Sequence, residues 1–158
     1  LAEGPILVET YGDALAFCNR PAPRTPGEAK FSLQHAVAVV AVRGRPALAD
    51  FEPDAIADPA LAAVRARVSC RVAEPFASAY PAHYGARVTA GGAVAEVADA
   101  WGDPERPMGL ADVEAKLRAL VAWGGLEAAD ADAALRCCAA GDAAPVGPLV
   151  DLVGRWVA

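Results

Sequence analysis

A helix-capping signal followed by a long apolar stretch constrains this sequence more than any other feature. In Thr25-Pro26-Gly27-Glu28, the threonine hydroxyl can accept the N3 amide, proline suits the first helical position, and glutamate can reach back to the cap. Gly44 offers a left-handed position at a helix end, and Pro46 cannot continue a helix. We therefore predict one helix over residues 26–43.

The second half of this predicted helix, residues 36–42, is apolar on every side, which implies burial on all faces. Overall composition is weaker evidence for a core, because 40 of the 158 residues are alanine within a hydrophobic share of 55%. At roughly 100–200 residues per domain, this length predicts a single domain over residues 1–158.

The remaining elements predict an α+β fold, with a small, mostly antiparallel sheet and helices packed on one face. Residues 5–10 form a β-prone run that we expect at a sheet edge, and 68–72 alternate like a strand. Gly91-Gly92 would close a β-hairpin between 86–90 and 93–98. Periodicity and capping predict further helices at 59–66, 110–124, 127–140 and 148–157.

Charge and hydropathy exclude several classes of partner. The net charge is −6 with a sequence pI near 4.8, and the arginines are scattered, which argues against nucleic acid as a partner. The longest apolar run is residues 36–42, far below the roughly 20 residues that a membrane span needs. The chain opens on Leu1 without a secretory leader, so we expect a cytoplasmic protein and a fragment of a longer one.

The four cysteines predict neither a metal site nor a disulfide framework. Cys18, Cys70, Cys137 and Cys138 form no C-x-x-C and have no metal-type spacing with the two histidines. A reducing compartment fits this pattern. We expect no metal and no cofactor.

The candidate functional side chains lie at the start of the 26–43 segment. Its polar groups are Glu28, Lys30, Ser32, Gln34 and His35, and lysine is rare here, since only Lys30 and Lys116 occur. An amine, an imidazole and a helix amino terminus suit a carboxylate ligand. Spacing alone favours the plainer interpretation of a surface lysine and a hydrogen-bonded core histidine, because the two diverge by about 140° on a helix.

Other polar residues have structural explanations. His83 lies in a loop between aromatic residues and is expected to pack there. Lys116 follows Asp112 by four residues, which is typical of a solvated helix face. Gly91-Gly92 fits a hairpin turn better than a phosphate loop. The sequence contains neither G-x-S-x-G nor H-E-x-x-H.

The stretch from Cys18 to His35, C-N-R-P-A-P-R-T-P-G-E-A-K-F-S-L-Q-H, resembles the opening of the C-terminal domain of the MmgE/PrpD family. That family includes 2-methylcitrate dehydratase, cis-aconitate decarboxylase and iminodisuccinate epimerase. The resemblance covers about residues 1–125 and leaves 126–158 as C-terminal helices. It continues through short motifs: Gly44, Asp50-Phe51, Asp58-Pro59, Tyr80-Pro81, Gly102-Asp103-Pro104, Pro107 and Lys116. Two departures, Leu117 and Met108-Gly109, concern helix packing and capping.

The resemblance implies that this chain is the α+β lid of a larger enzyme. Such enzymes carry an all-helical N-terminal domain, absent from this chain, and the active site lies between the two parts. They are metal-independent and remove a proton next to a carboxylate of a small di- or tricarboxylate. By this resemblance, Lys30 anchors a substrate carboxylate, and His35 is a second anchor or a proton-transfer group. Both are the predicted catalytic and substrate-binding residues.

Two functions follow as hypotheses. In the first, the chain is the lid of a lyase or isomerase, foremost a 2-methylcitrate dehydratase-like enzyme that forms a homo-oligomer such as a dimer. The isolated chain is then expected to be inactive. In the alternative, it is a non-catalytic carboxylate-binding or interaction module derived from that family.

Overall fold

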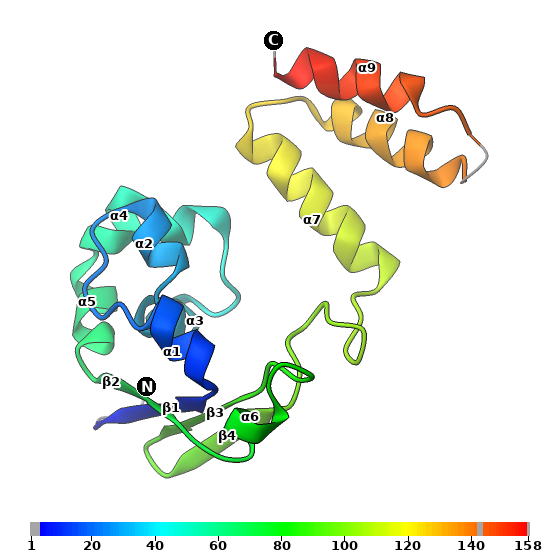
Figure 1. Ribbon diagram of the computed structural model, residues 1–158. Helices are drawn as coiled ribbons and strands as arrows, with labels where there is room; N and C mark the ends of the chain where they lie inside the picture. The colour runs from blue at the N-terminus through cyan, green and yellow to red at the C-terminus, as the bar shows by residue number, and fades with distance from the viewer. Residues whose placement is uncertain (1–3, 142–143, 158) are drawn as a thin grey trace. The chain divides into compact units, whose positions relative to one another are not determined.

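The computed structural model describes residues 4–141 and 144–157. Their contacts divide the chain into two compact units, Leu1–Arg106 and Pro107–Ala158. The first unit holds all four strands of the described chain, and the second is helical (Figure 1). The expected α+β class is confirmed.

The sheet of the first unit has the strand order β2-β1-β3-β4. Strand β1 (Ile6–Thr10) runs parallel to β2 (Val68–Val72) and antiparallel to β3 (Ala86–Ala90), which pairs with β4 (Ala93–Val97). The sheet is therefore mixed, and the predicted edge position of the first strand was wrong. β1 is central because a helical crossover returns the chain to pair beside it in parallel.

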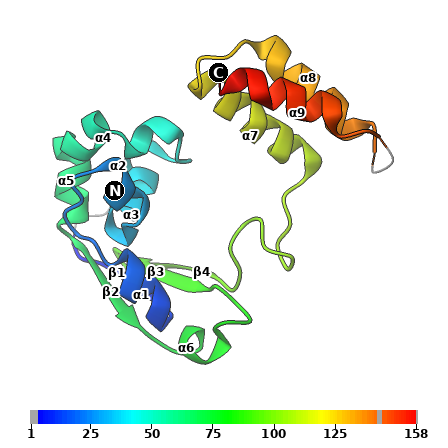
Figure 2. The same cartoon turned by 45° about the horizontal axis from the view of Figure 1, so that its top comes forward.

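Helices of the first unit gather mainly over one side of this sheet. Helices α2, α3, α4 and α5 lie on the same side in both views (Figure 1 and Figure 2). Ile6 and Val8 of β1 meet Val39 of α3 and Leu61 of α5 in the core, each at most 2% exposed. The elements are α1 (Gly12–Cys18), α2 (Pro26–Lys30), α3 (Leu33–Arg43), the 3-10 helix η1 (Leu48–Phe51), α4 (Pro53–Ala57), α5 (Pro59–Arg65) and α6 (Phe76–Ala79).

The single helix predicted over 26–43 is two helices. Thr25 caps α2, with its Oγ1 accepting from the Glu28 amide at 3.2 Å, so the predicted start is confirmed. The Glu28 carboxylate accepts from the Arg24 amide at 2.7 Å and not from the Thr25 amide, so the predicted return bond of the capping box was wrong. Ser32 then caps α3, with its Oγ accepting from the His35 amide at 3.0 Å. This second cap gives an amide in the first turn of α3 its acceptor. α2 ends two residues earlier, at Lys30. Burial on all faces was also wrong, because Val40 is 55% exposed.

The other face of the sheet carries a row of charged side chains. The register sets Glu9 of β1 between Arg71 of β2 and Arg87 of β3, and sets Arg87 opposite Glu96 of β4. Arg71 and Glu9 meet at 2.7 Å, and Arg87 meets Glu96 at 2.7 Å. Opposite charges thus alternate across all four strands, which stabilises their pairing without a second helical layer.

Gly85 is a position where the backbone tolerates no side chain. A Cβ there would lie 2.7 Å from Phe76 Cδ1 and 2.9 Å from the Ala98 carbonyl oxygen. We expect Gly85→Ala to lower the free energy of unfolding by roughly 1–3 kcal/mol through overpacking. Urea unfolding measures this, with Gly154→Ala as control, since nothing lies within 4 Å of that site and alanine favours a helix. Equal midpoints for wild type and Gly85→Ala would refute the expectation.

The second unit contains α7 (Leu110–Trp123), α8 (Ala128–Ala139) and α9 (Gly147–Trp156), which confirms the three helices predicted there. α8 packs against both α7 and α9. Val121, Ala131, Ala134 and Leu152 are buried, while Lys116 is exposed as expected. No helix in the described part of the chain is long and apolar enough to cross a membrane.

Candidate functional site

Lys30 is the last residue of α2, and its side chain is exposed. Within residues 4–141 and 144–157, no hydrogen bond or ion pair engages its amine. Phe31 beside it is 56% exposed. The break after α2 places Lys30 at a helix carboxyl end, where a cation is favoured, and not at the amino-terminal end of a long helix. This amine is thus free to meet an anion from outside the chain.

His35 lies in the first turn of α3 and has no exposed surface. Its Nε2 lies 2.7 Å from the Asp50 carbonyl oxygen, and its Nδ1 lies 3.0 Å from Arg65 Nη1. A carbonyl only accepts and a guanidinium only donates, so Nε2 carries the proton and Nδ1 presents its lone pair. The Phe51 ring meets the imidazole edge-on at 5.7 Å. Hydrogen bonds therefore assign one neutral tautomer.

Asp50 presents its carbonyl to His35 because its carboxylate is fixed on the opposite side. Oδ1 accepts from Arg43 Nη1 at 2.7 Å, and Oδ2 accepts from the Ala47 amide at 2.7 Å. Burial alone would raise the pKa of Asp50, but the Ala47 amide and Arg43 outweigh it and hold that pKa below its usual value. Arg43 also pairs with Asp58 at the start of α5. These contacts fix η1 against α3.

Arg65, at the end of α5, is 9% exposed. Besides His35 Nδ1, its guanidinium donates from Nη2 to the Ile56 carbonyl at 2.9 Å. Burial lowers the pKa of this guanidinium. No sequence pattern points to this residue, because its partners lie 30 and nine positions away in the chain.

Gln34 keeps the structural role expected of it. Its Nε2 donates to Asn19 Oδ1 at 2.7 Å, and its Oε1 accepts from the Arg20 amide at 3.1 Å. Ser32 Oγ donates to the Arg20 carbonyl at 2.6 Å. The arm before α2 is thereby fixed to the start of α3.

The structure thus separates the two predicted site residues. Lys30 faces solvent at the end of α2, while His35 is enclosed by Asp50, Arg65 and Phe51. No described contact joins Lys30 to His35. Lys30 can bind an anion as it stands, whereas His35 can engage a ligand only after one of its ring hydrogen bonds breaks.

The family model of the MmgE/PrpD C-terminal domain matches residues 4–139. The chain belongs to the MmgE/PrpD family. No curated protein matches the sequence. The match confirms the resemblance and extends it beyond residue 125, through α7 and α8. Because the MmgE/PrpD family includes lyases and dehydratases, the context of this domain is enzymatic.

A second polar cluster of the MmgE/PrpD domain lies at the C-terminal end of β1. Tyr11 and Tyr80 stack with ring centroids 4.6 Å apart, and Tyr84 meets both edge-on at 5.7 Å. Tyr80 donates its hydroxyl to Asp13 Oδ2 at 2.7 Å. His83, expected to pack in this loop, has Asp99 as its hydrogen-bond partner at 2.7 Å. These contacts fix the loop before β3.

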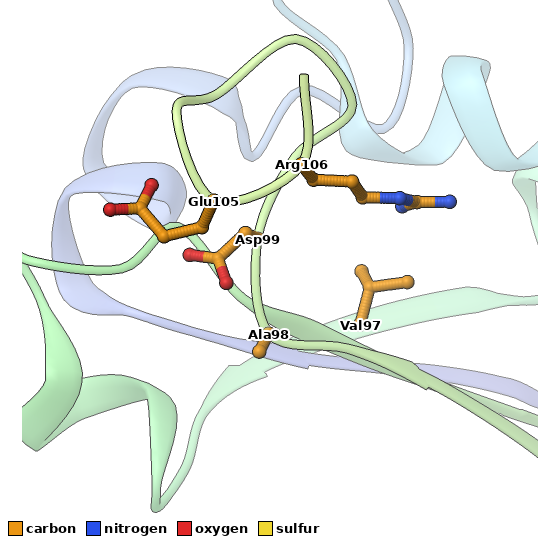
Figure 3. Close-up of a pocket in the computed structure, with 5 residues that line it drawn as sticks. All are labelled: Val97, Ala98, Asp99, Glu105 and Arg106. Atoms are coloured by element: carbon orange, nitrogen blue, oxygen red, sulfur yellow. The ribbon is translucent and has the colours of Figure 1, made fainter. Parts of the chain in front are cut away.

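The hollow drawn in Figure 3 does not contain the predicted site. Its volume is about 250 Å³, and it is lined by Val97, Ala98, Asp99, Glu105 and Arg106. The carboxylates of Asp99 and Glu105 point to one side and the Arg106 guanidinium to the other (Figure 3). Asp99 is already engaged by His83, so the hollow presents no converging set of free groups.

The His83–Asp99 pair makes the domain sensitive to pH. The hydrogen bond to Asp99, then the charges of Asp99 and Glu105, raise the pKa of His83 above its ordinary 6.5. The stabilisation is therefore complete below pH 6.5 and is lost as pH rises through the raised pKa. We expect Asp99→Asn to lower the titration midpoint of His83 in proton NMR. An unchanged midpoint would show that the pair is not formed in solution.

Proposed function

We propose that this chain is the lid domain of a lyase or isomerase acting on a small di- or tricarboxylate, foremost by dehydration of a 2-methylcitrate-like substrate. The match to the MmgE/PrpD C-terminal domain over residues 4–139 carries the proposal. A helical domain, supplied as another part of the enzyme, completes the active site. The reaction begins with removal of a proton next to a substrate carboxylate.

Lys30 is the proposed carboxylate anchor. Its exposed amine, without an ion-pair partner among the described residues, is available to a substrate. Negative charge grows on the substrate carboxylate as the neighbouring proton leaves, and a fixed cation stabilises that growth more than it stabilises the ground state.

His35 is the proposed proton-transfer group or second anchor. A neutral imidazole with its lone pair on Nδ1 can accept a proton. That nitrogen accepts from Arg65 in this structure, so Arg65 holds the lone pair in position until lid and substrate come together and the contact opens. The proposed catalytic residues are thus the exposed cation of Lys30 and the base His35, whose lone pair accepts from Arg65 in this structure.

The enclosure of His35 favours a second candidate, a non-catalytic module derived from the family. An imidazole without exposed surface and with both nitrogens hydrogen-bonded already serves a structural purpose. In that case Lys30 alone would bind a carboxylate, and replacing His35 would change stability without changing any reaction. The two candidates therefore differ in whether adding a helical partner domain produces turnover of a carboxylate substrate.

The isolated chain is expected to leave 2-methylcitrate unchanged, because it supplies only part of the proposed site. Adding the proposed helical partner domain should start dehydration, measured by the ultraviolet absorbance of the new carbon–carbon double bond. Turnover by the chain alone would refute the division of the site between two domains. No turnover of any small di- or tricarboxylate by the joined domains would favour the non-catalytic module.

A further inference from the structure

Arg65 is a buried cation that meets no carboxylate in the part of the chain that the structure describes. Arginine is seldom buried to 9% exposure unless an anion accompanies it. Arg43, on the facing helix, meets Asp50 at 2.7 Å and also pairs with Asp58. Arg65 instead divides its two amino groups between the Ile56 carbonyl and the His35 ring. The Asp58 carboxylate attracts Arg65 only from beyond ion-pair distance, and both hydrogen bonds of the guanidinium go to neutral acceptors, one of them His35.

The hydrogen bonds to the two ring nitrogens of His35 agree on the neutral tautomer. The Asp50 carbonyl accepts from Nε2, Arg65 donates to Nδ1, and Phe51 contributes an apolar ring. The Asp50 carboxylate is turned away to Arg43 and the Ala47 amide. A second ring proton would have to replace the Arg65 hydrogen bond and would set an imidazolium against a guanidinium.

We propose that Arg65 is a positioning residue for His35, which it holds as the neutral imidazole with its lone pair on Nδ1. This inference rests on the proposed function, in which His35 serves the reaction. It decides between the two roles left open for His35: a neutral ring enters the reaction as a proton acceptor, not as a charged anchor for a carboxylate. Lys30 is then the cationic anchor of the pair.

The hydrogen-bonding state can be read in the chain itself, without any activity. His35 and His83 are its two histidines, so nitrogen-15 NMR gives two imidazole patterns, with exposed His83 as the internal reference. At pH 7 we expect His35 to carry its proton on Nε2 and to show a coupling between Nδ1 and an Arg65 side-chain nitrogen. A proton on Nδ1, or on both ring nitrogens, would overturn the proposal.

Arg65→Met removes the donor at similar length, Arg65→Lys keeps a cation, and Arg67→Met is the matched control two residues away. We expect Arg65→Met to move the Nδ1 resonance toward that of an unbonded nitrogen, Arg65→Lys to move it less, and Arg67→Met to leave it in place. If Arg65→Met does not fold, the wild-type coupling and the lysine variant still decide. An Nδ1 resonance that ignores both Arg65 variants would overturn the proposal.

Kinetics of the joined two-domain enzyme separate positioning from a purely structural role. Arg65→Met is expected to lower kcat by roughly 10–100-fold, as loss of a group that orients a reacting residue does, with KM nearly unchanged. Arg65→Lys should recover part of that loss. Unchanged kcat in a folded Arg65→Met enzyme would overturn the proposal. Inactivity of the wild-type enzyme on every carboxylate would instead refute the proposed function, whatever the NMR shows.

Discussion

His35→Ala is expected to lower kcat of the joined two-domain enzyme by roughly 10²–10⁴-fold, the usual range for loss of a general base. The Nδ1 lone pair of His35 disappears in this variant, while the proposed anchor Lys30, exposed at the end of α2, is unaffected. KM should therefore change much less than kcat. Steady-state kinetics on 2-methylcitrate give both constants.

Stability must be measured beside the kinetics, because the removed ring is fully buried. Alanine leaves the Asp50 carbonyl and Arg65 Nη1 without their partner, and an unsatisfied buried group costs about 1–3 kcal/mol. Two such groups together cost about 2–6 kcal/mol, so a domain in the middle or upper part of the usual range of about 5–15 kcal/mol survives the loss. Circular dichroism during urea unfolding shows whether the variant lid is folded under assay conditions.

His35→Asn is the matched control, since its side-chain oxygen can accept from Arg65 near the position of Nδ1 but cannot act as a base. We expect it to recover part of the stability and none of the activity. Full kcat in either variant would remove His35 from the catalytic site. Activity that followed stability across both variants would favour the structural role.

Local chemistry in the sequence predicted most of the helices and strands. The Thr25 cap, the Asp58-Pro59 start and the Gly91-Gly92 turn each act within a few residues, and each appears as expected. Ser32 was missed because its neighbours continue the helical pattern on both sides. Only its hydrogen bonds, from the His35 amide and to the Arg20 carbonyl, distinguish a cap from an ordinary helical serine.

The position of β1 in the sheet and the neighbours of His35 depend on contacts between residues that are distant in the chain, so the sequence pattern could not predict them. The β-prone run at residues 5–10 predicts a strand, but its central position depends on pairing with Val68–Val72 and Ala86–Ala90. The same limit applies to the site. The motif predicts Lys30 and His35 as site residues, whereas Arg65 and the Asp50 carbonyl become neighbours of His35 only when α5 and η1 pack on α3.

The second large effect is expected at Lys30. Lys30→Met should lower kcat/KM of the joined enzyme by roughly 10²–10³-fold, comparable to loss of a group that stabilises developing negative charge. The side chain is exposed and makes no described ion pair, so the free energy of unfolding should stay within about 0.5 kcal/mol of wild type. This variant therefore tests chemistry with little interference from stability.

Lys116→Met is the matched control for Lys30→Met, because Lys30 and Lys116 are the two lysines of the chain and both are exposed. The two variants change net charge equally, so any effect of total charge on an anionic substrate is the same in both. Only a local contact can separate them. If Lys116→Met lowered kcat/KM as much as Lys30→Met, long-range attraction would explain the loss, and Lys30 would be a surface lysine after all.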